Sequence, residues 1–269
     1  MGLGFRSPLR ADIFRHQSQI DFLEITADHF LDAPSEKLAE LELLADHFTL
    51  IPHALNLSLG SAEGIDGAYV EKLAALVDRV NPPWWSDHLC FTRAGGVDIG
   101  HLSPLPLTQE AVDVVCQNIE RVRGFIALPL LLENIAYTVQ WPETEMTEAA
   151  FVSAVAEQAD CGLLLDVANL YANSVNHEFD PVAFFEQLPR DRIVQLHFAG
   201  GHWHDGILID SHAHPVLPAA WELMESVVRS CSANSCSVRG IILERDENFP
   251  AFTDILAELH QARTLVEVV

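Results

Sequence analysis

Eight short apolar runs, most of them separated by helix-like segments, are the feature that most constrains the fold of this sequence. Several runs, such as LPLLL and GLLL, contain no polar residue, which is typical of strands buried on both faces of a parallel sheet. Strands that alternate with helices favour such a sheet. The expected strands cover residues 2–5, 22–25, 50–57, 84–86, 128–132, 162–165, 193–196 and 240–243.

Helical periodicity follows most of these runs, and Ser35, Thr108 and Thr147 stand where helices are expected to begin. Eight strand–helix units form a closed (β/α)8 barrel more naturally than an open, doubly wound sheet, which is the alternative. Such a barrel usually takes about 250 residues, and the chain has 269. We therefore predict an α/β fold, a single TIM-type barrel domain over residues 1–269. The expected helices cover residues 35–46, 67–80, 108–125, 147–159, 181–187, 218–230 and 251–263.

Composition and charge disfavour several classes of protein. Hydrophobic residues make up 49% of the chain and charged residues 20%, so a large core can form and disorder is not expected. The 15 Lys and Arg face 39 Asp and Glu, and the formal net charge of −24 repels a phosphate backbone. No apolar run approaches the roughly 18 residues of a membrane span. We expect neither a nucleic-acid partner nor a membrane partner.

The N-terminus and the cysteines indicate the compartment. The segment MGLGFRSPLRADIF lacks the long apolar stretch of a signal peptide. The cysteines are odd in number, scattered and never in C-x-x-C spacing, which favours reduced thiols over a disulfide framework or a zinc knuckle. We expect a cytoplasmic protein with free thiols at Cys90, Cys116, Cys161, Cys231 and Cys236.

Histidines and carboxylates follow every expected strand after the first. His53 lies in the third apolar run, His88 just after the fourth and Glu133 just after the fifth. In a barrel the C-terminal ends of the strands meet at one mouth, where active sites lie. The residues expected at this mouth include Glu24, Asp28, His29, His53, His88, Glu133, Asp166, His197, Asp210, His212, His214 and Glu244.

A mouth with at least four imidazoles and four carboxylates favours metal ions. Buried carboxylates repel one another unless cations neutralise them, and mixed His and carboxylate ligands suit iron, manganese or zinc. Taken singly, a His at a strand end is more often a hydrogen-bonded core residue, and Glu133 could pair with an arginine. The repetition of the pattern at successive strands favours a metal cluster, and the number of ligands favours two or three ions.

Six motifs, in chain order, resemble those of one known family. They are PHALNLSLGS, SDHLCF, LLLEN, LLLDVANLY with NHEFDP, QLHFAGG with LIDSHAHPV, and LERDENFP. Together they span almost the whole chain. Through them the sequence is identified as similar to the multinuclear non-heme iron-dependent oxidative enzymes, the MbnB/TglH-like family. The resemblance implies a TIM barrel of the xylose-isomerase-like type.

The resemblance also implies an activity. It implies two or three iron ions, mixed Fe(II)/Fe(III), as cofactor and O2 as co-substrate. The implied reaction is the oxidative modification of a residue, with cysteine as the first candidate, in a ribosomally synthesised precursor peptide during the biosynthesis of a peptide natural product. A small partner protein that presents this peptide is implied as well. In our hypothesis one iron binds the cysteine thiolate while a neighbouring iron activates oxygen.

Carried over by position, the resemblance implies a set of site residues. Glu133, His53 and Asp210 are the expected catalytic residues, and Glu133 is the expected bridge between ions because one carboxylate can bind two cations. Asn169 is a further candidate, as a ligand or as a substrate contact. The implied metal ligands are His53, His88, Glu133, Asp166, His197, Asp210, His212 and Glu244.

Two positions depart from the family pattern. Ala213 follows His212 where many members have Asp, and Arg245 follows Glu244 where many have Trp. Neither change removes an implied ligand, but both alter the surroundings of the substrate. Arg245 and His202 are candidates for binding a carboxylate of the peptide.

Two other functions stay open at this stage. The same barrel and ligand types could hold zinc or manganese in a hydrolase or isomerase that acts on a sugar or a phosphodiester. The protein could also bind metal or peptide without catalysis. Iron with visible absorbance would distinguish oxidation from colourless zinc chemistry, and oxygen uptake with peptide would distinguish an enzyme from a binding protein.

Overall fold

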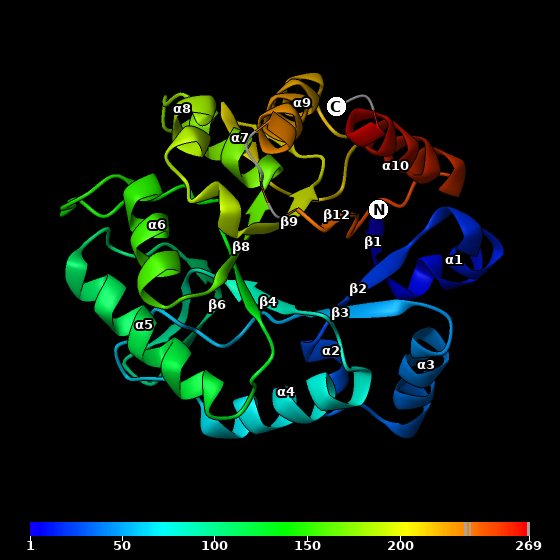
Figure 1. The fold of residues 1–269 in the computed structure, drawn as a ribbon, viewed down its shortest axis with the longest axis horizontal. Helices are drawn as coiled ribbons and strands as arrows, with labels where there is room; N and C mark the ends of the chain where they lie inside the picture. Colours follow the sequence, from blue (N-terminus) through cyan, green and yellow to red (C-terminus); the bar gives the residue numbers. More distant parts are fainter. Residues whose placement is uncertain (234–235, 237, 268–269) are drawn as a thin grey trace.

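A closed barrel of eight parallel strands lies at the centre of the molecule (Figure 1). The computed structural model describes residues 1–233, 236 and 238–267. The barrel strands are β1 (Gly2–Gly4), β2 (Phe22–Thr26), β3 (Thr49–His53), β4 (Trp85–His88), β7 (Leu130–Glu133), β8 (Gly162–Asp166), β9 (Ile193–Phe198) and β12 (Gly240–Leu243). Their order around the barrel is β1-β12-β9-β8-β7-β4-β3-β2. The predicted TIM-type barrel is confirmed, and an open sheet is excluded.

Helices cover the outside of the barrel (Figure 1). They are α1 (Arg10–Arg15), α2 (Asp28–Leu31), α3 (Ser35–Ala45), α4 (Gly67–Val80), α5 (Gln109–Arg123), α6 (Glu148–Gln158), α7 (Val167–Asn176), α8 (Pro181–Glu186), α9 (Pro218–Ala233) and α10 (Phe252–Glu267). Thr108 and Thr147 cap α5 and α6 through their side chains, as their positions in the sequence predict. Ser35 is instead the first residue of α3, which has no side-chain cap.

The barrel interior on the N-terminal side of the strand ends is filled by side chains from several of the strands. These strands form the wall of the barrel, so side chains from different sides of the wall can contact one another only in its interior. Glycine makes room for one of them: a Cβ atom at Gly2 would lie 2.5 Å from the ring of Phe22. The inner cluster contains Ile51, Trp84, Leu131 and Leu164, with Phe22 and Val194 packed against it.

Side chains alternate between the inside and the outside of the barrel along each strand. In β7, Leu131 belongs to the inner cluster, whereas Leu130 and Leu132 belong to the larger core between the barrel and its helices. Glu133 lies two residues after Leu131 and therefore points inward. This alternation decides which polar residues at the strand ends face the barrel interior.

The third strand is shorter than predicted, because β3 ends at His53 rather than at residue 57. The N–H of Ala54 still donates to the carbonyl of Ser86 in β4 (2.8 Å), but the N–H groups that follow donate to side chains. The N–H of Leu55 donates to Asp28 Oδ2 (2.9 Å), and that of Leu57 donates to Asp87 Oδ2 (3.2 Å). These carboxylates satisfy donors that a strand ladder would otherwise have to satisfy.

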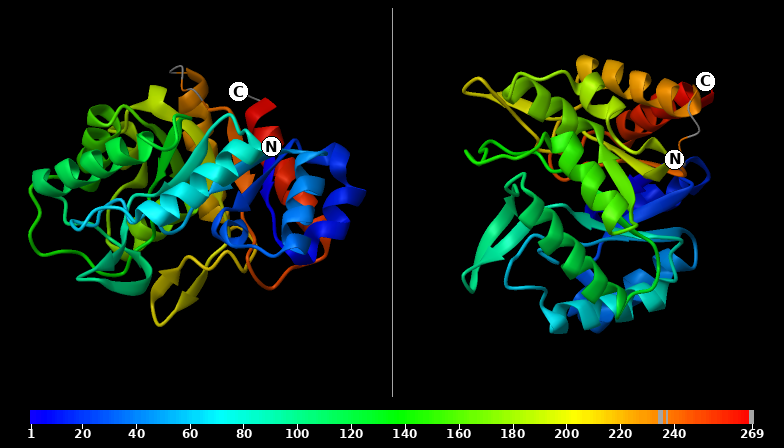
Figure 2. Two further views of the ribbon diagram at one scale, coloured as in Figure 1. Left: turned by 90° about the horizontal axis from the view of Figure 1, so that it is seen from below. Right: turned by 60° about the vertical axis from the view of Figure 1, so that its left-hand side comes forward.

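Two antiparallel hairpins were not predicted. One consists of β5 (Phe91–Ala94) and β6 (Val97–Ser103), and the other of β10 (His202–His204) and β11 (Ile207–Ile209). Their turns contain Gly95-Gly96 and Asp205-Gly206, all at positive φ, which is the backbone geometry of tight hairpin turns. Figure 2 shows that both hairpins extend from the same end of the barrel.

All five cysteines are free thiols, as predicted. Cys90, Cys161 and Cys231 are buried, and the other two are partly exposed. Within the described ranges, no helix is both long enough and apolar enough to cross a membrane.

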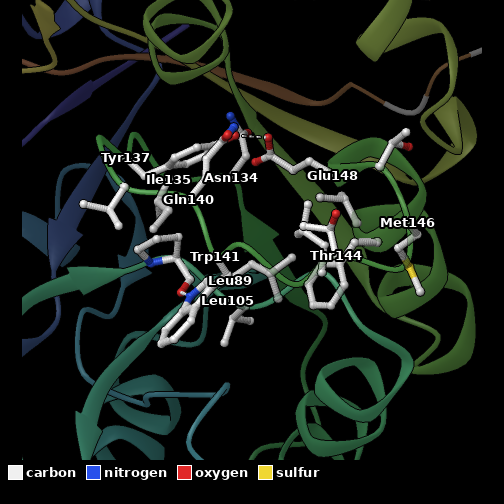
Figure 3. Close-up of a pocket in the computed structure, with 16 residues that line it drawn as sticks. Leu89, Leu105, Asn134, Ile135, Tyr137, Gln140, Trp141, Thr144, Met146 and Glu148 are labelled. Carbon is white, nitrogen blue, oxygen red and sulfur yellow. Dashed lines mark hydrogen bonds between the residues drawn. The ribbon is translucent and has the colours of Figure 1, made fainter. Parts of the chain in front are cut away.

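A cavity of about 340 Å³ lies beside the barrel (Figure 3). It is bounded by the segment after β4, the segment after β6, the connection from β7 to α6, and α6 itself. Leu89, Leu105, Ile135 and Phe151 give it largely apolar walls. It therefore borders two of the strand ends at which metal ligands are predicted.

Candidate metal centre

The inward positions at the C-terminal ends of the barrel strands carry histidines and carboxylates. His53, Glu133 and Asp166 each lie two residues after a member of the inner apolar cluster, so the same alternation turns all three inward. The predicted ligands that are buried at this end of the barrel are His53, His88, Glu133, Asp166, His197 and Glu244.

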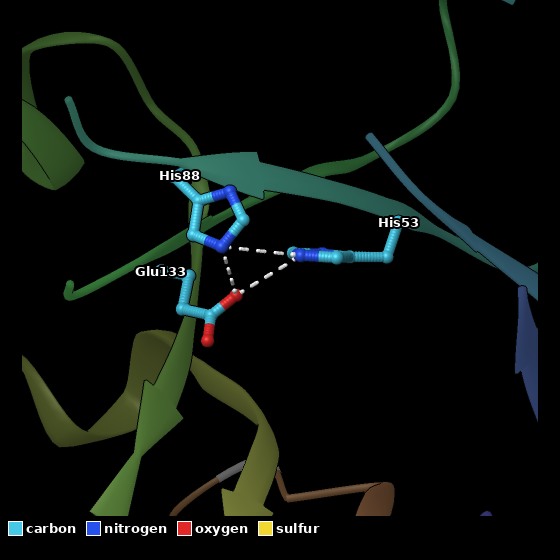
Figure 4. Close-up of side chains that lie close together, drawn as sticks. All are labelled: His53, His88 and Glu133. Atoms are coloured by element: carbon cyan, nitrogen blue, oxygen red, sulfur yellow. Dashed lines mark hydrogen bonds and ion pairs between the residues drawn. The ribbon is translucent and has the colours of Figure 1, made fainter. Parts of the chain in front are cut away.

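His53, His88 and Glu133 form a triangle (Figure 4). Nε2 of His53 lies 3.3 Å from Nε2 of His88, and Oε2 of Glu133 lies 3.4 Å and 3.5 Å from these two nitrogens. Ligand atoms about 2.1 Å from a tetrahedrally coordinated cation are about 3.4 Å apart. The triangle therefore has the spacing of three ligands of one cation.

Glu133 belongs to a second group as well, with Asp166, His197 and Glu244. The ligand atoms of this group lie within 4.8 Å of one another. Nδ1 of His197 is 3.4 Å from Oε1 of Glu133 and 3.0 Å from Oε2 of Glu244. Glu133 thus directs one oxygen toward each group, an arrangement compatible with its predicted role as a bridge.

Several buried atoms of these groups lack a hydrogen-bond partner among the residues that the structure describes. They include Oε2 of Glu133, Oδ2 of Asp166 and Nδ1 of His197. A buried polar atom without a partner destabilises the folded state. A cation would supply the missing partner to all three, so the donor set and its unpaired atoms fit metal binding.

Asp166 divides its two oxygens between structure and site. Oδ1 caps helix α7 by accepting from the backbone N–H groups of Ala168 (2.7 Å) and Asn169 (2.9 Å). The side chain of Asn134 holds the backbone of Asp166 through two hydrogen bonds of 2.9 Å. With its position fixed in this way, Asp166 has Oδ2 free for a cation.

Hydrogen bonds on the far side of the candidate ligands determine which ring nitrogen faces the site. Nδ1 of His53 forms a 2.8 Å hydrogen bond with Ser86 Oγ, which leaves Nε2 toward the triangle. Nε2 of His197 lies 2.9 Å from Glu24 Oε2, which also accepts from Gln195 Nε2 at 2.7 Å. A carboxylate behind a ligating histidine typically fixes its tautomer. Glu24 was expected at the mouth but not in this supporting position, and Gln195 was not predicted at all.

Asp210 and His212 adjoin these groups without belonging to either one. Nε2 of His212 lies 2.8 Å from Asp210 Oδ2, and Nδ1 lies 3.2 Å from Asp246 Oδ2 and 3.6 Å from Glu244 Oε2. Arg6 forms an ion pair with Asp246 and lies 3.7 Å from Glu244. The structure therefore places this pair of predicted ligands beside the centre. Neither Arg6 nor Asp246 was in the predicted ligand set.

Burial favours the uncharged form of several of these groups. It raises the pKa of Glu133 to about 8 and that of Asp166 to about 6. It lowers the pKa of His88 to about 4, and burial together with neighbouring His88 and His197 holds the pKa of His53 well below its usual range. A cation binds the ionised carboxylate and the neutral imidazole, so it favours ionised Glu133 and supports neutral His53 and His88.

His197 and His212 have pKa values shifted in the opposite direction. Burial alone would lower the pKa of His197, but Glu24, Glu244 and Glu133 around it raise that pKa well above its usual range. In His212 the same burial effect is outweighed by Asp210 and Glu244, which raise its pKa. Because a metal ion competes with protons for these nitrogens, its affinity should weaken as the pH falls.

Comparison with known proteins assigns the chain to a family. Residues 1–267 match the family described as "RiPP precursor modification enzyme MbnB/TglH/ChrH", in which RiPP denotes a ribosomally synthesised and post-translationally modified peptide. The chain belongs to this family. A "UPF0276 protein" of Caulobacter vibrioides (strain NA1000 / CB15N) is 36% identical over 263 residues, 97% of this chain and 92% of the relative. A "UPF0276 protein" of Shewanella oneidensis is 36% identical over 264 residues, with the same coverage.

Solved structures share the fold of this MbnB/TglH/ChrH family member at low sequence identity. A "D-tagatose 3-epimerase-like protein" superposes with a TM-score of 0.63 at 13% identity and covers 99% of this chain and 98% of its own. A "Putative Xylose isomerase" from Rhodospirillum rubrum gives 0.60 at 11% identity, covering 100% and 98%. At such identities the likeness concerns the fold alone, and it confirms the xylose-isomerase-like barrel.

Two of the three predicted substrate contacts lie close to the centre or on a neighbouring hairpin. Asn169 is buried, donates from Nδ2 to the carbonyl of Asn134 (3.0 Å), and has an unpaired Oδ1 among the described residues. His202 lies on β10, partly exposed, with Nδ1 3.2 Å from Ser211 Oγ and its ring 4.8 Å from that of His214. Either position is compatible with a substrate contact.

Arg245, the third predicted substrate contact, does not face the mouth. Neighbouring residues of an extended chain point in opposite directions, so Arg245 turns outward where Glu244 turns inward. Its side chain is 1% exposed and donates to Glu258 Oε2 on α10 at 2.7 Å. This burial leaves Arg245 inaccessible to a substrate carboxylate, which corrects the prediction.

Proposed function

We propose that this protein is a multinuclear iron enzyme that uses O2 to oxidise a cysteine of a ribosomally synthesised precursor peptide. The observation that carries the proposal is the position of Glu133, whose two oxygens face two different groups of potential ligands. Membership of the MbnB/TglH/ChrH family supports a precursor peptide as the substrate. Iron bound by such ligands with open coordination positions supplies thiolate binding and oxygen activation.

The ligand sets follow from the two groups. One iron would be held by His53, His88 and Glu133. A second would be held by Glu133 with three further residues, and a third ion would take Asp210 and His212 at the edge of the centre. The further ligands of the second iron are Asp166, His197 and Glu244.

The remaining task of the chain is to position these ligands and exclude bulk water. Glu24 accepts a hydrogen bond from Nε2 of His197, and Ser86 pairs with Nδ1 of His53, so each ring presents its other nitrogen to the centre. Glu133 and Asp166 are 2% and 0% exposed, so little bulk water reaches their carboxylates. A closed site of this kind strengthens electrostatic interactions and limits side reactions of an oxidised substrate.

We extend the proposal to the presentation of the peptide and the cellular location of the enzyme. A precursor peptide must enter the mouth with its cysteine near the centre, and we propose a small partner protein that presents it. We also propose a cytoplasmic location, which the free thiols support.

The experiment combines metal analysis with oxygen consumption. Protein purified without oxygen should contain two or three irons per chain, and it should consume O2 only with a cysteine-containing precursor peptide encoded beside its gene. The same peptide with Cys→Ser is the matched control. Zinc or manganese as the native metal, with turnover of a sugar or phosphodiester, would favour a hydrolase or isomerase instead. Bound iron without peptide-dependent O2 consumption would favour a binding protein.

A further inference from the structure

The cavity beside the barrel contains a single charged side chain in an otherwise uncharged lining (Figure 3). Leu105, Ile135 and Val152 contribute to its apolar walls. Glu148, the first residue of α6, is the only Asp, Glu, Lys, Arg or His among the described residues that line it. The cavity of about 340 Å³ thus combines largely apolar walls and a few uncharged polar side chains, such as Asn134 and Gln140, with one carboxyl group.

Glu148 has one oxygen paired and one available. Tyr137 donates its hydroxyl hydrogen to Glu148 Oε2 at 2.7 Å. Across the described residues, Oε1 has no hydrogen-bond partner and no Lys, Arg or His pairs with this carboxylate. The cap of helix α6 does not use this carboxylate either, because Thr147 Oγ1 caps the helix by accepting from the N–H of Ala150 (3.2 Å). The carboxylate therefore has unused capacity to accept a hydrogen bond.

The wall that carries Tyr137 is fixed by helix α7. Asn173 donates from Nδ2 to the carbonyl of Ile135 (2.8 Å) and accepts from the N–H of Tyr137 (3.0 Å). The ring of His177 stacks on that of Tyr137, with centroids 4.6 Å apart and planes at 21°. The cavity is held in shape before any ligand binds, which reduces the entropic cost of binding.

A second hollow adjoins the cavity on the side of Asp210. Its volume is about 210 Å³, and it shares Pro104, Tyr137 and Val139 with the larger cavity. Asp210, which adjoins the two ligand groups, lines this second hollow. The two hollows are thus neighbours, with Glu148 lining one and Asp210 lining the other. A ligand that spans both would have one part beside the metal centre and another beside Glu148.

The chemistry of the cavity favours an aliphatic chain that ends in an ammonium group. The apolar walls suit methylene groups, and burial raises the pKa of Glu148 to about 7, a cost to ionisation that an adjacent cation would offset. A guanidinium group binds carboxylates best with two parallel hydrogen bonds. Because Tyr137 already takes one of the two acceptor sites of Oε2, an ammonium group that needs only Oε1 is the less demanding fit.

We propose that this cavity binds the side chain of a lysine in the peptide substrate, with its methylene groups against the apolar walls and its ammonium group donating to Glu148 Oε1. The net charge of −24 favours the approach of a cationic segment. The assignment to a peptide lysine rests on the proposed function. The binding of an alkylammonium ion does not.

The first experiment tests the cavity with small probes at pH 8, by isothermal titration calorimetry on the intact protein. n-Pentylammonium should bind at least ten-fold more tightly than n-pentanol. Glu148→Gln should remove this difference. Glu143→Gln should preserve it, because Glu143 is exposed in the connection from β7 to α6 and does not line the cavity. Thr144→Trp, at an exposed position of the lining, should weaken both probes by filling the opening.

Two results would overturn the ammonium site. One is equal affinity for n-pentylammonium and n-pentanol. The other is an unchanged ammonium affinity in a Glu148→Gln variant that melts like the wild type. Should that variant fail to fold, Thr144→Trp decides, because unaltered binding of both probes would mean that they bind elsewhere.

The second experiment tests the peptide with the same method in the absence of O2. Blocked peptides with one cysteine and one lysine, separated by one to four alanines, are compared with peptides that carry methionine in place of lysine. At least one lysine peptide should bind ten-fold more tightly than its methionine counterpart, and Glu148→Gln should abolish the gain. If no spacing shows a gain, the lysine assignment is wrong. Peptide-dependent O2 consumption is measured separately, so failure of the proposed function is distinguishable from failure of this inference.

Discussion

Glu133 is a carboxylate in surroundings that oppose its charge when no cation is present. It is 2% exposed, and burial, together with the nearby carboxylates of Asp166 and Glu244, raises its pKa to about 8 in spite of His197. A folded protein keeps such a group only where something offsets its desolvation. Two adjacent cations would do so, since each of its oxygens faces a different set of ligands.

We expect Glu133→Gln to remove metal while the fold persists. In the metal-free protein the carboxyl is largely protonated at pH 7, so a neutral amide of the same shape should melt within a few degrees of the wild type. The amide nitrogen is a poor ligand, and at least one metal ion should be lost together with peptide oxidation. Elemental analysis and thermal melting measure the two effects. Glu157→Gln, exposed on α6, is the control. Full metal content and turnover in Glu133→Gln would contradict the placement of the centre.

Single residues also show where sequence reasoning is sufficient and where it is not. The sequence shows that Glu24 lies in a predicted strand. Its supporting position could not be predicted, because it depends on contacts with Gln195 and His197 from another part of the barrel. The outward direction of Arg245 could have been predicted from the alternation after Glu244. Its partner Glu258 could not, because that contact requires the packing of α10 against β12.

At the scale of elements, β8 and α7 are joined through one side chain. Asp166 is the last residue of β8 and the N-cap of α7, so the strand end, the helix start and a candidate ligand coincide. Helix α7 was not predicted, although an Asp before a helical pattern is a typical N-cap signal. The motif was interpreted only as a ligand position, and its structural role was missed.

Two substitutions at Asp166 should separate these roles. Asparagine is a good N-cap and retains Oδ1, so Asp166→Asn should keep the stability of α7 while losing the free carboxylate oxygen and a metal ion. Asp166→Ala removes the cap as well and should lower the free energy of unfolding by about 0.5–2 kcal/mol more. Urea unfolding of the metal-free proteins and elemental analysis of the metal-bound ones provide the comparison. Equal metal content in Asp166→Asn and the wild type would rule out Asp166 as a ligand.

The hairpins illustrate a limit of periodicity at the same scale. β6 is largely exposed and β10 is partly or fully exposed, so neither has the apolar alternation by which a half-buried strand is predicted. The turn signals Gly95-Gly96 and Asp205-Gly206 were present in the sequence. Both hairpins are also held by side chains from elsewhere in the chain: Asn176 pairs with both backbone groups of Leu208, and Ser58 accepts from the N–H groups of Thr92 and Arg93. An analysis based on apolar runs does not detect such contacts.

At the scale of the whole molecule, barrel closure was predictable because it depends on the number of strands. The first and last strands, β1 and β12, pair in parallel, with Gly2 opposite Ile242. Eight apolar runs alternating with helices are sufficient to expect this closure. The cavity that holds Glu148 was not predictable, since its walls come together from the segments after β4 and β6, the connection from β7 to α6, and α6 itself.

The pH dependence of global stability should report on Glu148. Burial raises its pKa from 4.5 to about 7 in the folded protein, so between these values the unfolded chain ionises this carboxyl and the folded chain does not. Ionisation then favours the unfolded state, and the wild type should lose stability relative to Glu148→Gln as the pH rises from about 4.5 to about 7. The pKa shift corresponds to a loss of roughly 3 kcal/mol in the free energy of unfolding, complete above pH 7 and absent below pH 4.5.

The comparison of wild type with Glu148→Gln isolates this ionisation. The amide introduced by Glu148→Gln would keep a carbonyl oxygen that accepts from the hydroxyl of Tyr137, so the loss of a hydrogen bond should not confuse the comparison. Urea unfolding of the wild type, Glu148→Gln and the exposed control Glu143→Gln between pH 4 and 8 measures the effect. A difference between the first two that stays constant over this range would show that Glu148 is not desolvated, and it would remove the electrostatic reason for an ammonium group in its cavity.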